Sequence, residues 1–284
     1  MKRFLLIPLL LFLLSGCSGG DTFTSPDGVP IAFDKVGDGD ITLVLVHGWS
    51  CDRSYWQKQV EGLSDRFTIV TLDLAGHGES GMQRGNYTMD AFGRDVAAVV
   101  NGLDLQNVYL VGHSMGGSVI VEAAPFLEGR LLGLIGIDTL QQPSFHFEET
   151  QVDGFMQPMR EDFPAAVDGF VRGMFPADAD TALVNQVVAD MASAPPEVAL
   201  SALRNMLLND LQATLGRLDL PIFCLNANMN PIDFQAWKVY QGGYTAVVME
   251  GLGHFLFMED PEGFNAELVD LVERMQEFSA KKAG

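Results

Sequence analysis

Basic residues are scarce in this sequence. Lysine and arginine together number 17 in 284 residues, against 37 aspartates and glutamates, so the net charge is −20. A chain without a basic stripe has few groups that displace the counterions of nucleic-acid phosphates, which argues against nucleic acid as a partner. The same acidity disfavours strongly anionic substrates and anionic lipid headgroups as main partners.

Cysteine is equally rare, with three residues in the chain: Cys17, Cys51 and Cys224. We expect Cys51 and Cys224 to be buried free thiols, because Cys224 lies inside the apolar stretch "PIFCLN"; their even number leaves a disulfide open. Paired Cys/His spacing and H-E-x-x-H are both missing, so no metal site is predicted. No convincing nucleotide-binding glycine pattern occurs, and we expect no cofactor.

The sequence begins with an apolar run, Phe4–Leu14, that is too short to cross a bilayer, which takes about 20 residues. Lys2 and Arg3 precede the run and small residues follow it, as in a secretory signal peptide over residues 1–16. The ending "LSGC" resembles a bacterial lipobox, which implies cleavage before Cys17 and lipid attachment to its sulfur. The alternative is an ordinary signal peptide with a chance cysteine.

The residue after Cys17 is Ser18 rather than aspartate. By resemblance to Gram-negative sorting rules, this favours the outer membrane. We therefore expect a cell-envelope lipoprotein that faces the periplasm and contacts the membrane through its lipid anchor. The sequence gives no indication of the oligomeric state.

Apolar stretches alternate with helical patterns along the chain. Continuous apolar runs predict buried strands at 41–48 and 67–74, further strands are predicted at 107–114, 131–138, 220–226 and 245–251, and the alternating pattern of 29–37 predicts an edge strand of a hairpin. Helices are predicted at 54–65, 88–103 and 261–282, so the sheet should be mostly parallel with helices on both faces. Residues 141–218 show only amphipathic helical segments, which predicts a helical cap inserted into a core of residues 17–140 and 219–284.

The strongest chemical signal is "GHSMGG", Gly112–Gly117, which matches G-x-S-x-G with Ser114 at its centre. A predicted strand precedes the motif and a predicted helix follows it, as this strained turn requires. Gly112 and Gly116 let the turn close, and the turn lifts the Ser114 hydroxyl off the end of the sheet. The backbone N–H of Met115 then points to where an oxyanion would form.

Three further motifs accompany this turn in order: "HGW" (His47–Trp49), "DLAGHGES" (Asp73–Ser80) and "GLGHFLFMEDPEGF" (Gly251–Phe264). Together the four resemble the α/β-hydrolase superfamily from about residue 22 to the C-terminus. The resemblance implies the α/β-hydrolase fold, which is a mostly parallel eight-stranded sheet with helices on both faces and a helical cap after the sixth strand.

The resemblance also assigns roles. It implies that His254 is the general base for Ser114, and that Trp49 and Met115 supply the two backbone N–H groups of an oxyanion hole. Their side chains, an indole and a thioether, are then free to line the pocket. The other histidines are not expected to be catalytic. His47, His77 and His113 are expected to be turn and scaffold residues, and His146 is expected to be a surface or pocket residue.

The acid of the triad is harder to identify. In most relatives it follows the seventh strand, where this chain has "LNANMNPID" with Asn228 or Asn230 in the usual position. An amide supplies no negative charge to an imidazolium, so another carboxylate is needed. The candidates are Asp138, at the end of the predicted sixth strand, and Asp233; we favour Asp138, and Asp233 remains open.

The predicted cap suggests the substrate class. It is rich in aromatic residues and methionine, which line most ligand pockets: Phe145, Phe147, Phe155, Met156, Met159, Phe163, Phe170, Met174 and Phe175. We therefore expect a serine hydrolase that cleaves a small or medium apolar carboxylic ester through an acyl-enzyme. Thioesters, lactones, amides and C–C bonds remain open, and the alternative function is a noncatalytic ligand-binding lipoprotein of this fold.

Overall fold

A computed structural model describes residues 21–144 and 146–283. Residues 1–16, Cys17 and Phe145 lie outside these ranges, so what the sequence suggests about them stays a prediction. Within the described ranges, no helix combines the length and the apolar character needed to cross a membrane.

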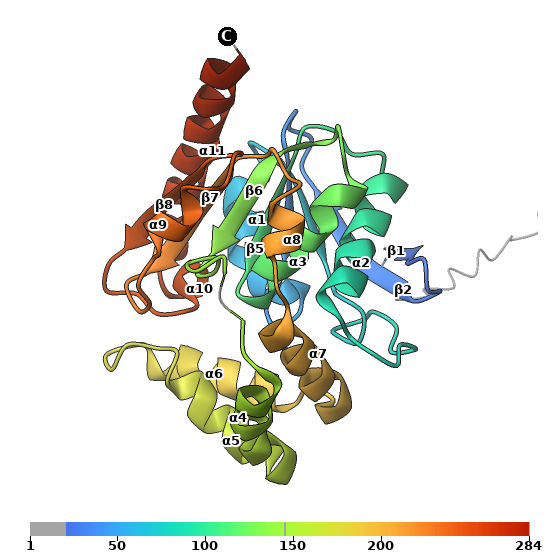
Figure 1. The fold of residues 1–284 in the computed structure, drawn as a ribbon, viewed down its shortest axis with the longest axis vertical. Coiled ribbons are helices and arrows are strands. Elements are labelled where there is room, and N and C mark those ends of the chain that lie inside the picture. The colour runs from blue at the N-terminus through green and yellow to red at the C-terminus, as the bar shows by residue number, and fades with distance from the viewer. Residues whose placement is uncertain (1–20, 145, 284) are drawn as a thin grey trace, which may run out of the picture.

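A single eight-stranded sheet runs through the described chain (Figure 1). The strand order is β1-β2-β4-β3-β5-β6-β7-β8. Neighbouring strands from β4 to β8 are parallel, whereas β2 is antiparallel to both β1 and β4. The bounds are β1 Asp21–Thr24, β2 Pro30–Val36, β3 Thr42–Val46, β4 Thr68–Leu72, β5 Val108–His113, β6 Leu131–Ile137, β7 Ile222–Ala227 and β8 Tyr244–Met249. The mostly parallel eight-stranded sheet predicted from the sequence is confirmed.

The central strands are buried on both faces. Every residue of β3, β4 and β5 is buried, as expected for parallel strands rich in valine, leucine and isoleucine. One strand prediction was wrong in detail: 29–37 was expected at the sheet edge, but β2 pairs on both sides and β1 is the edge strand. β1 is short and mostly exposed, which explains why its sequence gave no strand signal.

Helices lie on both sides of the sheet: α1 is behind it in the view of Figure 1 and α2 is in front. Thr88 caps α2 by accepting a hydrogen bond from the Ala91 N–H. The packing helices and short turns are η1 Arg53–Trp56, α1 Gln57–Leu63, α2 Met89–Gly102, α3 Met115–Ala123, η2 Ala124–Phe126, α8 Gln212–Leu215, α9 Phe234–Trp237, α10 Leu256–Glu259 and α11 Pro261–Ala283.

Of the five helices between β6 and β7 in the described chain, the four that precede α8 gather below the sheet in Figure 1, opposite the C-terminal end of α11. They are α4 Glu149–Glu161, α5 Phe163–Arg172, α6 Thr181–Ala192 and α7 Pro196–Leu208. The insertion therefore follows the sixth strand, as expected of a cap. The domain boundaries at 140/141 and 218/219 remain a prediction.

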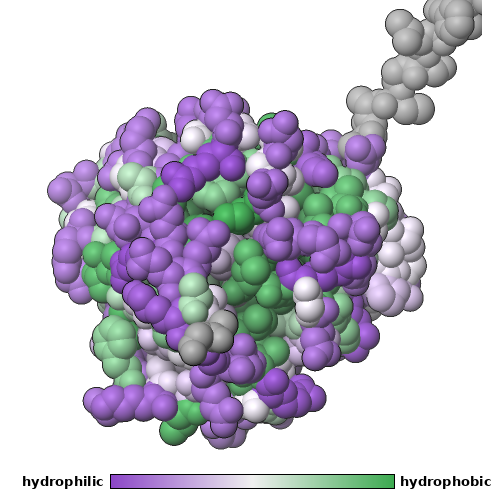
Figure 2. All heavy atoms as spheres, turned by 90° about the horizontal axis from the view of Figure 1, so that it is seen from above, coloured by the Kyte–Doolittle hydropathy of each residue, from purple (hydrophilic) through white to green (hydrophobic). Residues whose placement is uncertain are grey.

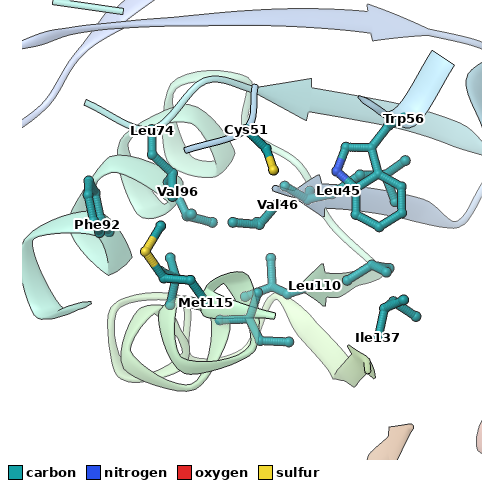
Figure 3. Packing of buried hydrophobic residues seen from close by; sticks show 14 of the residues in the cluster. Leu45, Val46, Cys51, Trp56, Leu74, Phe92, Val96, Leu110, Met115 and Ile137 are labelled. Carbon is teal, nitrogen blue, oxygen red and sulfur yellow. The ribbon is translucent and has the colours of Figure 1, made fainter. Parts of the chain in front are cut away.

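The buried hydrophobic residues of the strands and of the covering helices form one continuous cluster. Figure 3 shows Leu45, Val46 and Leu110 of the central strands, with Trp56 on one side and residues of α2 and α3, among them Phe92 and Met115, on the other. Cys51 and Cys224 are buried and unpaired, which confirms the prediction of free thiols. On the face seen in Figure 2, polar side chains cover most of the surface and hydrophobic ones show between them.

Three of the histidines belong to this core. Burial lowers the pKa of His47 to about 4 and that of His77 to about 3, and it holds the pKa of His113 well below its ordinary value. His47 accepts a hydrogen bond from the Leu74 N–H at 3.0 Å through Nε2, and Nδ1 of His77 donates to the Ala75 carbonyl at 3.1 Å. Both are therefore neutral residues that hold turns. His146 is exposed.

These buried histidines should make folding sensitive to acid. Their folded pKa values lie below the ordinary 6.5, so the unfolded chain binds more protons as the pH falls. The free energy of unfolding should drop below about pH 6.5 by about 1.4 kcal/mol per pH unit for each such histidine. We expect His77→Asn to flatten this slope between pH 7 and 5 in urea unfolding experiments; an unaltered slope would contradict the assignment.

Candidate active site

The turn between β5 and α3 presents Ser114. Its backbone is strained, with φ 54° and ψ −117°, which is the conformation that a sharp strand-to-helix turn imposes. A Cβ at Gly112 would collide with the Gly116 carbonyl, and a Cβ at Gly116 would collide with the Val46 carbonyl. The two glycines are therefore required by close packing of the backbone, as the motif predicted. The Ser114 N–H donates to the Ile137 carbonyl at 3.0 Å, which ties the turn to β6.

His254 lies in the loop between β8 and α10 and is held through its backbone. Its N–H donates to the Met174 carbonyl at 2.8 Å, and its carbonyl accepts a hydrogen bond from Nε2 of His113 at 2.9 Å. Its imidazole is largely buried, with 16% of the side chain exposed. The buried His113 thus supports the loop that carries the second histidine.

Asp138 directly follows β6 and contacts this imidazole. Its Oδ2 lies 2.5 Å from Nδ1 of His254. Its Oδ1 accepts a hydrogen bond from the Ala227 N–H at 3.0 Å and another from Nε2 of Gln141 at 3.3 Å. Only 1% of the carboxylate side chain is exposed. An acceptor that is buried, doubly supported and adjacent to Nδ1 is placed to fix the tautomer and orientation of the imidazole.

The alternative carboxylate has a different position. Asp233 caps α9, because its Oδ1 accepts hydrogen bonds from the N–H groups of Gln235 and Ala236 at 3.0 and 2.9 Å. Asn228 is exposed and donates to Glu250 at 2.7 Å, and Asn230 is exposed as well. The structure therefore brings Asp138 to His254 and does not bring Asp233 there.

Ser114 and His254 line one cavity of about 30 Å³ between the core and the inserted helices. No hydrogen bond joins the Ser114 hydroxyl to the imidazole within the described residues. A hydrogen bond between a nucleophile and its general base often forms only in the complex with substrate.

Apart from Gly48 and His113, the rest of the cavity wall consists of apolar residues and one cysteine. The core contributes Trp49, Cys51 and Phe255, and the inserted helices and their connections contribute Phe170, Met174, Met191, Leu203 and Met206. The methionines come from three different segments of the insertion, so the wall combines an apolar surface with flexible side chains. Of the cap residues that the sequence suggested, Phe170 and Met174 reach this cavity.

The two residues expected to supply oxyanion N–H groups place their side chains differently. Trp49 lines the cavity, and its Nε1 donates to the Ala199 carbonyl of α7 at 2.7 Å. Met115 is fully buried and is not among the residues that line the cavity, and Figure 3 shows its thioether near Phe92 and Val96. As the first residue of α3, Met115 carries one of the N–H groups that have no partner within their own helix.

Sequence reasoning missed two residues here. Cys51 lines the cavity, and its thiol donates to the Trp49 carbonyl at 3.3 Å. Burial raises the pKa of this thiol well above its ordinary value. Asn226 is fully buried and accepts a hydrogen bond from the Thr139 N–H at 3.1 Å. A polar residue within an apolar strand was the signal that marked Asn226. Among the described residues, no group of three or more His, Cys, Asp or Glu side chains is arranged to hold a metal ion.

Comparison with known proteins agrees with this architecture. A Yersinia enterocolitica pimeloyl-[acyl-carrier protein] methyl ester esterase is 29% identical over 253 residues, 84% of this chain and 95% of the relative. A Petunia hybrida karrikin insensitive 2 receptor (CA) is 24% identical over 242 residues, 80% of this chain and 90% of the receptor. The esterase EaEST from Exiguobacterium antarcticum superposes with a TM-score of 0.80 at 22% identity, covering 89% of this chain and 99% of the esterase.

A family model decides the classification. The model described as "Alpha/beta hydrolase family" matches residues 43–267, which include the Ser114 turn, the Asp138 turn and the His254 loop. The match covers more than half of the chain. This chain is therefore an alpha/beta hydrolase, a member of the family that its four motifs predicted.

Proposed function

We propose that the protein hydrolyses a small or medium apolar carboxylic ester through an acyl-enzyme, with Ser114 as nucleophile, His254 as general base and Asp138 as acid. The observation that carries this proposal is the 2.5 Å contact between Asp138 and Nδ1 of His254 beside a serine that shares the same cavity. The contact leaves Nε2 of the imidazole as the nitrogen that exchanges a proton with the serine.

Each chemical step then has a residue. Ser114 Oγ attacks the ester carbonyl while Nε2 of His254 takes its proton, and the tetrahedral oxyanion accepts hydrogen bonds from the N–H groups of Met115 and Trp49. The imidazolium returns the proton to the departing alkoxide, so the alcohol leaves and an acyl-serine remains. Water gives a proton to the same imidazole as it attacks the acyl-serine, and the imidazolium returns that proton to Ser114 Oγ as the carboxylic acid leaves.

Asp138 is the preferred acid because of its surroundings. Its carboxylate is buried and held by hydrogen bonds, so it faces the imidazolium with little screening by water. Asp233 uses its carboxylate to cap α9. Two relatives with esterase names, from Yersinia enterocolitica and Exiguobacterium antarcticum, agree with ester hydrolysis as the reaction class.

Replacing each carboxylate by its amide tests the acid. Asp138→Asn should lower kcat by about ten-thousandfold, because the imidazolium loses its counter-charge and the tautomer is no longer fixed. Asp233→Asn should leave kcat within about threefold, because surface substitutions usually have small effects. The measurement is steady-state hydrolysis of p-nitrophenyl butyrate by variants that circular dichroism shows to be folded. Loss of activity in Asp233→Asn alone would reverse the assignment.

The narrow cavity favours short acyl chains. A volume of about 30 Å³ holds about two water molecules, and its wall is mostly apolar. We expect kcat/KM to be highest for p-nitrophenyl acetate and butyrate and to fall toward the octanoate. Met206→Ala should raise the octanoate-to-butyrate ratio of kcat/KM by about tenfold, because each methylene that fits a pocket contributes about 1–3 kcal/mol.

A matched control distinguishes a larger cavity from a general loss of packing in the inserted helices. Met156 is buried in α4 but is not part of the cavity wall, so Met156→Ala should leave the ratio unchanged. An equal rise in both variants, or no rise in Met206→Ala, would contradict a pocket limited by this wall.

The N-terminal segment supports a second proposal, that the protein is a periplasm-facing lipoprotein anchored at the outer membrane through Cys17. The support is the sequence "LSGC" after a short apolar run. In a Gram-negative host, labelled palmitate should enter the protein, and Cys17→Ala should abolish the label while Cys51→Ala retains it. Label that persists in Cys17→Ala would refute the anchor.

One comparison favours a second candidate function. The relative from Petunia hybrida is named a receptor, so a ligand-binding role within this fold has a precedent among similar chains. A fluorophosphonate probe that modifies activated serines separates the two functions. Labelling that disappears in Ser114→Ala supports the hydrolase, whereas absence of labelling in the folded wild-type protein supports the noncatalytic binder.

A further inference from the structure

The turn that carries Asp138 is strained. Asp138 has φ 44° and Leu140 has φ 58°, although neither residue is glycine. Non-glycine residues rarely adopt this left-handed region, and they stay there only where the surroundings hold them. The position of the Asp138 carboxylate therefore depends on whatever fixes the turn.

β7 holds the beginning of the turn. The Asp138 N–H donates to the Leu225 carbonyl at 2.8 Å, and the next N–H, that of Thr139, donates to Oδ1 of Asn226 at 3.1 Å. Backbone pairing between β6 and β7 ends at Ile137–Leu225, so the Asn226 side chain continues the pairing by one step beyond the ladder. An apolar residue at 226 would leave the Thr139 N–H without this acceptor.

The end of the turn is held from α9 and β8. The Leu140 carbonyl accepts hydrogen bonds from Nε1 of Trp237 at 3.0 Å and from the Tyr244 hydroxyl at 3.2 Å. Trp237 and Tyr244 stack on each other with ring centroids 4.2 Å apart, which limits the movement of both donors. Side chains from β7, α9 and β8 thus bind Thr139 and Leu140, and the backbone of β7 binds Asp138.

An amide suits this position better than a carboxylate. Asn226 is fully buried and lies on the strand next to the Asp138 turn. A second buried carboxylate there would oppose the charge of Asp138 and promote sharing of a proton between the two groups. The amide oxygen accepts the Thr139 N–H without adding charge. This accounts for one asparagine of the "LNANMNPID" segment, in which an acid was expected.

We propose that Asn226, together with Tyr244, is a positioning residue that holds the strained 138–140 turn so that the Asp138 carboxylate meets Nδ1 of His254. This inference rests on the proposed triad and adds to it the side chains that set the geometry of the acid. Neither residue touches the reacting atoms, and both act through Asp138.

The test is a double-mutant cycle between Asn226 and Asp138. The readout is the second-order rate constant for modification of Ser114 by a fluorophosphonate, measured on folded full-length protein. Asn226→Ala should lower this rate constant by about tenfold or more, because small misplacements of catalytic groups have effects of this size. In an Asp138→Asn background the same substitution should change it by less than about threefold, since no carboxylate is left to position.

The outcomes are distinct. Equal losses in both backgrounds would show that Asn226 acts on the fold at large, and an unchanged rate in the single variant would show that it has no effect; either result overturns the inference. A folded wild-type protein that is not modified at all would overturn the proposed hydrolase function itself.

Two further variants make the cycle robust. Tyr244→Phe removes only the hydroxyl that donates to Leu140, so it should show the same coupling to Asp138→Asn even if Asn226→Ala does not fold. Asn228→Ala is the matched control, because its side chain contacts Glu250 at the surface, and it should leave the rate constant unchanged in both backgrounds. Absence of coupling between Tyr244→Phe and Asp138→Asn would contradict the proposed positioning role.

Discussion

The contact between Asp138 and Nδ1 of His254 is the interaction on which the rest of the site depends. A carboxylate removed from water is stable only when its oxygens are hydrogen-bonded, and both oxygens of Asp138 have partners. The partners come from three places: the β7 end, the turn itself and the histidine loop. The orientation of the imidazole is therefore a property of how the carboxyl ends of β6 and β7 and the loop after β8 meet.

The site also shows where the fold tolerates strain. Ser114, Asp138 and Leu140 all have positive φ, and all lie at carboxyl ends of neighbouring parallel strands. Strained backbone persists only when the surrounding structure over-determines it, and here hydrogen bonds to β6 and β7 and from side chains of β7, β8 and α9 do so. The buried and neutral His113 adds support from beneath the His254 loop. The strands thus fix the positions of the Ser114 hydroxyl and the Asp138 carboxylate, which loops alone would hold less firmly.

Much of this could be predicted from the sequence because its signals are local. Apolar runs identified β3 to β8, and G-x-S-x-G specified the turn that carries Ser114. The choice between Asp138 and Asp233 was harder, because it depends on which strand ends meet in space. β1 was missed because four mostly exposed residues give no apolar pattern. The hydrogen bond from the Thr139 N–H to Asn226 could not be predicted, because it depends on the register in which β6 and β7 pair.

The inserted helices are joined to the site by backbone carbonyls. The Ala199 carbonyl receives the indole N–H of Trp49, and the Met174 carbonyl receives the N–H of His254. A carbonyl offers the same acceptor whatever side chain its residue carries, so the residues that line the cavity are free to diverge while both loops stay anchored. The residues of the inserted helices that line the cavity can therefore be substituted without loss of these two anchors, whereas a replacement of the whole insertion would have to reproduce the positions of two main-chain oxygens.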